Sequence, residues 1–163
     1  PAHTDDLTPT LAAAKKLRAI ELDNTLNMAR ELSLFIQQAT FVGHKLVVSN
    51  ESNQHILTFT LPMEALLKNK RVRQYVDEFS ATFQISINQQ GVPLSSELIY
   101  QGSGNPYFVL NIEAYGEITE QYQVVNNRLI LIDSHIKQGS KSFFGDFERN
   151  LQKTLRLFNN SVD

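Results

Sequence analysis

The glycines of residues 101–104, QGSG, resemble at first sight a loop that cradles a phosphate. A phosphate loop follows a strand and opens a helix, so that the N–H groups of the helix face the anion. Here Pro106 and a strand-like stretch follow, and no Lys-Ser or Lys-Thr pair comes directly after the glycines. The sequence therefore predicts that QGSGNP is a turn between two strands.

The histidines do not form a metal-binding pattern. None of them has the HExxH spacing; they are His3, His44, His55 and His135. His44 and His55 are expected to face each other across a hairpin, but two histidines without a third ligand make a weak metal case. We therefore expect surface histidines, with no metal and no cofactor.

Acidic and nucleophilic side chains give no catalytic pattern either. Glu113 and Glu117 lie four residues apart, and Asp77 and Glu78 are adjacent. Carboxylates that share acid–base chemistry must converge in space, which this spacing does not predict. The chain has no GxSxG nucleophile elbow and no cysteine. We therefore expect no enzymatic activity.

Composition predicts one globular domain over residues 1–163. Hydrophobic residues make up 42% and charged residues 20% of the chain, and the net charge is −2 from 15 basic and 17 acidic side chains. This balance argues against a nucleic-acid partner and gives no sign of a strongly cationic face for an anionic membrane. No run of 18 apolar residues is present.

The elements that must position any site begin with a predicted helix. Residues 1–10 are interpreted as a flexible lead-in, and residues 11–42 as a long helix that ends near Gly43. An apolar stripe recurs at spacings of three or four on this helix, with Met28, Leu32 and Phe35 beside it. The stripe is formed by Leu22, Leu26, Ala29, Ser33 and Ile36.

After this helix the apolar period changes to two and predicts an antiparallel sheet over residues 44–132. Its first hairpin is placed at 44–50 and 54–61, and a short helical insert near 63–79. Asn126 and Asn127 suit a two-residue primed turn. A C-terminal helix is predicted over 142–158, because apolar residues recur there at spacings of three or four; they are Phe143, Phe147, Leu151, Leu155 and Phe158.

The predicted fold class is therefore α+β, with a long N-terminal helix packed on an antiparallel β-meander and an additional C-terminal helix. Two passages of the chain resemble the GspH/FimT family of minor pseudopilins and minor type IV pilins. They are NMARELSLFIQQATFVGHKLVVSN and FQISINQQGVPLSSELIYQGSGNPYFVLNIEAYGEI. Gly91, Gly116 and Ile118 occupy places that match the turns of the family pattern.

This resemblance implies a non-enzymatic subunit that initiates or caps a pseudopilus of type II secretion or a type IV pilus. Its partners would be other pilin or pseudopilin subunits, assembled through the helix stripe. The full-length protein would be anchored in a bacterial inner membrane by a hydrophobic helical segment preceding this chain, with a periplasmic domain. The chain itself would be monomeric.

Two other functions stay open. One is an extracytoplasmic binding module that recognises a peptide or a lipid on its sheet face, which would require a pocket there. The other is a small enzyme whose titratable residues converge in a cleft.

Overall fold

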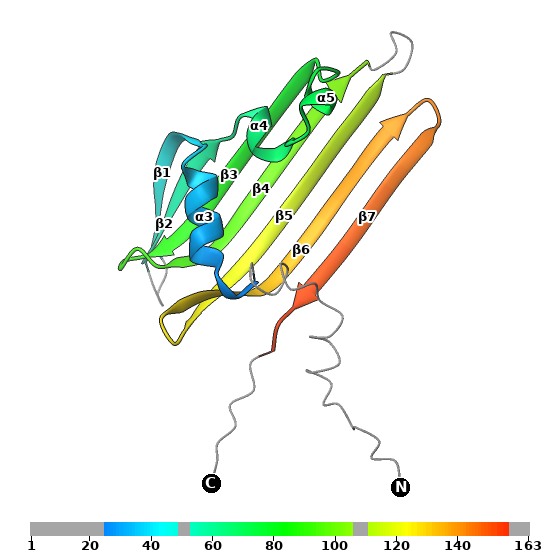
Figure 1. Ribbon diagram of the computed structural model, residues 1–163. Helices are drawn as coiled ribbons and strands as arrows, with labels where there is room; N and C mark the ends of the chain where they lie inside the picture. The colour runs from blue at the N-terminus through cyan, green and yellow to red at the C-terminus, as the bar shows by residue number, and fades with distance from the viewer. Residues whose placement is uncertain (1–24, 49–52, 106–110, 157–163) are drawn as a thin grey trace, which may run out of the picture.

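The computed structural model describes residues 25–48, 53–105 and 111–156, and these build a seven-stranded antiparallel sheet (Figure 1). Each strand is hydrogen-bonded to the strands before and after it in the chain, so the sheet is a meander. The strands are β1 (Thr40–Val48), β2 (Asn53–Thr60), β3 (Glu78–Asn88), β4 (Pro93–Gly104), β5 (Ile112–Val125), β6 (Arg128–Ser142) and β7 (Gly145–Thr154).

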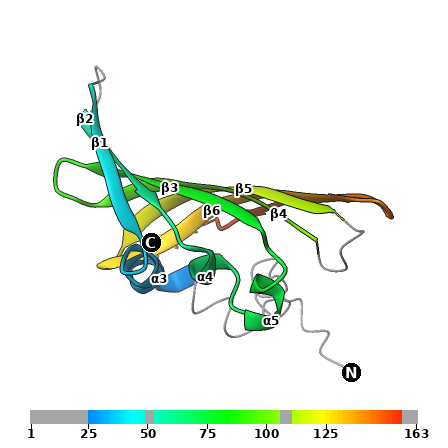
Figure 2. The same cartoon turned by 90° about the horizontal axis from the view of Figure 1, so that it is seen from above.

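Three described helices lie on the same face of this sheet, as the view from above shows (Figure 2). They are α3 (Met28–Ile36), α4 (Met63–Leu66) and α5 (Lys70–Arg73). We call this side the helix face and the opposite side the open face. No helix among the described residues is long and apolar enough to cross a bilayer.

The core lies between α3 and the helix face. Alternate residues of β3 point into it, and Phe83 and Ile85 are only 3% and 2% exposed. Met28 and Leu32 of α3 are buried above them. Fully burying side chains of this size stabilises the fold by about 1.5–3 kcal/mol each.

The open face is mostly polar, although Ile99 of β4 also lies on it, 50% exposed. Residues that alternate with the core positions are Thr82, Gln84 and Ser86 on β3, and Glu97 faces Thr119 across the pairing of β4 with β5. An antiparallel sheet tolerates water on one face when its residues alternate in this way.

The predicted fold of a long helix on a sheet is wrong. Helix α3 ends at Ile36, and residues 40–42, expected at the end of a helix, begin strand β1. Gly43 is therefore not a helix cap; it lies in β1 beside an irregularity between Phe41 and Gly43. The lead-in and residues 11–24 of the expected helix lie outside the described residues.

The predicted C-terminal helix over 142–158 is also wrong. Strand β7 occupies Gly145–Thr154 and pairs antiparallel with β6 along its whole length. The sheet therefore extends beyond the predicted end at residue 132. Residues 157 and 158 lie outside the described part of the chain.

Several local predictions are confirmed. The first hairpin is β1–β2, and the helical insert consists of α4 and α5. Asn126 and Asn127 join β5 to β6 with φ values of 49° and 60°, the left-handed conformation that a primed turn requires.

The turn assigned to QGSGNP is misplaced, because residues 101–104 are the last residues of β4. The strand-like stretch expected after Pro106 is strand from Ile112 on, as β5, which runs to Val125; residues 106–110 lie outside the description. Gly116 does not break this strand. It lies in the middle of β5, where a Cβ atom would overlap the ring of Tyr100.

Candidate functional site

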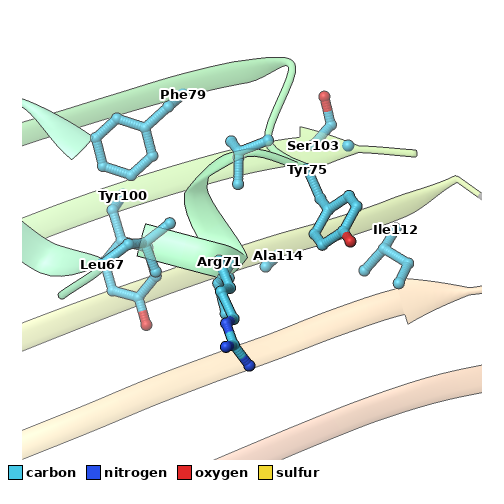
Figure 3. Close-up of a pocket in the computed structure, with 12 residues that line it drawn as sticks. Leu67, Arg71, Tyr75, Phe79, Tyr100, Ser103, Ile112 and Ala114 are labelled. Atoms are coloured by element: carbon cyan, nitrogen blue, oxygen red, sulfur yellow. The ribbon is translucent and has the colours of Figure 1, made fainter. Parts of the chain in front are cut away.

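A cavity of about 400 Å³ lies on the helix face, between α5 and the ends of β4 and β5 (Figure 3). The segment after α5 is held against β4 by a hydrogen bond in which the N–H of Asp77 donates to the carbonyl of Ser103, at 2.9 Å. Gly104 permits this contact, because a Cβ atom there would collide with the backbone of Tyr75. Glycine is thus needed at position 104 to seat the roof of the cavity on the sheet.

The floor of the cavity is hollow because two small residues lie opposite each other. Gly102 of β4 pairs with Ala114 of β5, and both line the cavity. The walls are formed by larger apolar and aromatic side chains. They are Leu67, Val72, Tyr75, Val76, Phe79, Tyr100 and Ile112.

Among the described residues that line this cavity there is no carboxylate and no histidine. Burial raises the pKa of Tyr100, so its phenol stays neutral across the physiological range. A polar ligand would lose its hydrogen bonds to water inside such a lining and gain few in return. The interior therefore suits a hydrocarbon group.

Two arginines of α5 have different roles. Arg73 is structural: its Nη1 donates to the carbonyls of Leu67 and Lys68 at 2.8 and 3.1 Å, and its Nε lies 3.7 Å from Glu64. Arg71 lines the cavity, and its guanidinium has no hydrogen-bond or ion-pair partner within the described residues. In Figure 3 this side chain starts beside Ala114 and extends across the strands. A guanidinium in this position can bind an anionic group at the end of a bound chain.

A polar cluster is formed by Ser96, Glu120 and Tyr122, none of which lines the cavity. Tyr122 donates a hydrogen bond to Oε2 of Glu120 at 2.6 Å, and Oγ of Ser96 lies 2.6 Å from the same phenolic oxygen. Burial raises the pKa of Glu120, while the hydrogen bond from Tyr122 and the nearby hydroxyl of Ser96 oppose the rise. Burial and then the charge of Glu120 raise the pKa of Tyr122.

Ser96 and Tyr122 are 7% and 6% exposed, whereas Glu120 is half-buried. Ser96 and Glu120 also line a polar hollow whose other residues belong mostly to the open face. No group of three or more metal-ligating side chains occurs within the ranges that the structure describes. His44 and His55 do meet, with Nε2 2.8 Å from Nδ1 and the rings stacked, but as a pair alone.

The residues predicted as an assembly stripe are partly brought together. Ala29, Ser33 and Ile36 line a shallow hollow at the other end of the sheet, and Gly91 lies in the same hollow. Gly91 has a φ of 79° in the β3–β4 turn. Leu26 precedes α3, and Leu22 lies outside the described residues. Ile118 packs against the core on the helix face.

Sequence reasoning missed the cavity. It placed Gly102 and Gly104 in a turn and did not single out Ala114. The available signal was the occurrence of small residues within strands, next to a short helical insert rich in apolar side chains.

The fold and its cavity define a class of architecture: an antiparallel meander with one wet face and one helix-covered face that is hollowed at one end. No family model matches the chain, and neither the curated proteins nor the solved structures contain a significant match to it. The function is therefore argued from the cavity itself.

Proposed function

We propose that this protein is a non-enzymatic binding module for an amphipathic ligand, with an apolar chain in the cavity and an anionic head group at Arg71. The observation that carries the proposal is the apolar lining of a cavity of about 400 Å³. Ligand sites in proteins have volumes of roughly 300–1,000 Å³ and apolar walls with a few polar groups. A fatty acid is the simplest ligand of this chemistry.

The hydrocarbon part supplies the affinity in this proposal. Each methylene group transferred from water into the cavity contributes about 0.8 kcal/mol when it is fully buried. The phenyl ring of Phe79 and the side chains of Val72 and Val76 offer the contact surface. The floor at Gly102 and Ala114 leaves room for the chain.

Specificity would come from the head group. A charge-assisted hydrogen bond contributes about 1.5–3 kcal/mol, which is roughly a tenfold to hundredfold gain in affinity for an acid over the alcohol of the same chain length. Arg71 is the residue for this contact, because Arg73 is already engaged with the backbone and Glu64.

The test is a fluorescence titration with a dansyl-labelled fatty acid, followed by displacement with unlabelled acids and alcohols. The variant Ala114→Leu fills the floor and should abolish binding. The matched control is Ser80→Leu, which introduces the same side chain on the open face of β3, where Ser80 is exposed. Ser80→Leu should bind as the parent does.

Arg71→Met tests the head-group contact separately. It should weaken binding of the acid by at least about tenfold and leave binding of the alcohol unchanged. Saturable binding that Ala114→Leu leaves intact would show that the ligand occupies another site and would refute the proposal.

The filament-subunit function implied by the GspH/FimT resemblance, with its inner-membrane location and pilin partners, stays a prediction. The fold from which it was drawn is wrong, since α3 spans nine residues and the sheet has seven strands. The binding-module alternative has the pocket that it required.

A further inference from the structure

The turn between β6 and β7 presents two phenylalanines to solvent. Phe143 and Phe144 are 85% and 80% exposed, and their rings lie edge to face with centroids 5.8 Å apart. Phe147, on β7, is 56% exposed. We call Phe143 and Phe144 the aromatic tip. Large apolar side chains gathered at one exposed point mark an interaction site.

The aromatic tip is held by an ordered turn. Ser142 and Gly145 are the last paired residues of the hairpin, and Oγ of Ser142 donates to the carbonyl of Gly145 at 3.0 Å. Gly145 takes a φ of 126°, so that neither phenylalanine has to adopt a positive φ. The strands therefore present both rings without a large loss of entropy on binding.

The aromatic tip lies at the same end of the sheet as the cavity. Ser142 pairs directly with Ile112 on β5, and Ile112 lines the cavity. Figure 1 shows the β6–β7 turn and α5 at the same end of the molecule. A surface that receives the tip would therefore also be close to the mouth of the cavity.

Charge is divided between the two faces of the described sheet. The open face carries more acidic than basic residues: Lys45, Arg128, Lys137 and Lys141 accompany Glu78, Glu97, Glu113, Glu117, Asp133, Asp146 and Glu148. On the helix side near the cavity, the insert carries Lys68, Lys70 and Arg71, and Arg149 lies on the helix face of β7. Acids of that region are engaged, Glu64 with Arg73 and Asp77 with Asn105. The net charge of the chain conceals this separation.

We infer that the aromatic tip inserts into the surface of an anionic lipid bilayer, with the basic insert and Arg149 turned toward the head groups and the mouth of the cavity at the membrane. Aromatic rings are stable at the boundary between head groups and acyl chains, and neighbouring cations add attraction to anionic lipids. Two rings on a single turn are too small for a stable protein interface, which buries at least about 1,000 Å². A bilayer imposes no such requirement.

The experiment exploits the absence of tryptophan from the chain. Phe144→Trp places one indole at the tip, and Val48→Trp places one at an equally exposed position, 71% for the native valine, at the far end of β1. Each variant is mixed with vesicles of phosphatidylcholine alone or with an equal part of phosphatidylglycerol. Indole emission and quenching by brominated lipid are recorded at low and high salt.

The expected result is a blue shift and quenching for Phe144→Trp with anionic vesicles, weakened by salt, and neither effect for Val48→Trp. The double variant Phe143→Ser, Phe144→Ser should lose at least about tenfold in partition coefficient. It should still bind the dansyl-labelled fatty acid, and Ala114→Leu should still bind vesicles, so that the membrane inference and the proposed function fail separately.

Three results would overturn the inference. They are an unshifted Phe144→Trp spectrum with anionic vesicles, parent-like vesicle binding by the double serine variant, and a blue shift of Phe144→Trp that grows with protein concentration without lipid. The last of these would assign the tip to self-association.

Discussion

Removing one hydroxyl group, in the variant Tyr122→Phe, should destabilise the fold far more than its size suggests. The phenolic group lies 2.6 Å from both Glu120 Oε2 and Ser96 Oγ. Because its single proton is donated to Glu120, Ser96 is the donor in the second bond. The substitution therefore leaves a half-buried carboxyl group without the donor from Tyr122, and the buried hydroxyl of Ser96 without its acceptor.

The magnitude follows from these two unpaired groups. An unsatisfied buried polar group costs about 1–3 kcal/mol, so we expect a loss of about 3 kcal/mol in the free energy of unfolding. For a chain of this size, that corresponds to a decrease of roughly 6–12 °C in Tm.

Urea denaturation followed by circular dichroism measures the loss directly. Tyr115→Phe is the matched control, because the hydroxyl of Tyr115 makes one long bond, 3.4 Å, to the exposed Glu148. Its effect should stay within about 0.5 kcal/mol. If Tyr122→Phe costs no more than Tyr115→Phe, the assignment of a buried, fully paired cluster is mistaken.

Two further predictions concern the same core. Burial raises the pKa of Glu120 above its ordinary value of 4.5. Between pH 4.5 and the raised pKa, the folded state therefore holds a proton that the unfolded state has released. Because the folded state binds more protons in this window, the free energy of unfolding should fall as the pH rises through it. Glu120→Gln should remove that fall when the free energy of unfolding is measured by denaturation from about pH 4 to about pH 8. An equal fall of this free energy with pH in parent and variant would contradict the reasoning. Gly116→Val should lower the free energy of unfolding by about 1–3 kcal/mol, because the new side chain displaces the ring of Tyr100. Gly43→Val should be nearly neutral, because a Cβ atom at position 43 meets nothing within 4 Å. Equal thermal stability of the two variants would count against this packing.

The strands with strict alternation were predictable from the sequence. In β3, Phe83, Ile85 and Ile87 alternate with polar residues, and only a two-fold period fits them. The turn at Asn126 and Asn127 was predictable for a separate reason, because asparagine tolerates the left-handed conformation that few other residues accept.

Strand β7 was mistaken for a helix because a spacing of four residues fits both periods. Phe147 and Leu151 share a face in a helix and equally in a strand. The distinguishing signal lay between them, in the unbroken row of polar residues at even positions. These are Asp146, Glu148, Asn150, Gln152 and Thr154.

The cavity could not be predicted from the periodicity of the sequence, for a different reason. It exists because the α5 segment lies on β4 at Gly104 and because Gly102 meets Ala114 across two strands. Both contacts join residues distant in sequence, and the pattern of one segment carries no information about the other.

The meander order of the strands has a consequence for how the chain reaches its fold. Every strand pairs only with its immediate neighbours in sequence, so each step of sheet formation closes one connection and no strand has to enter between two that are already paired. Loop-closure entropy is then lost in small increments, which favours rapid folding for a protein so rich in strand. Among the described strands, the same order leaves β7 at an edge and joins it to β6 alone, so a change in β7 leaves the pairing of β4 with β5 at the cavity as it is.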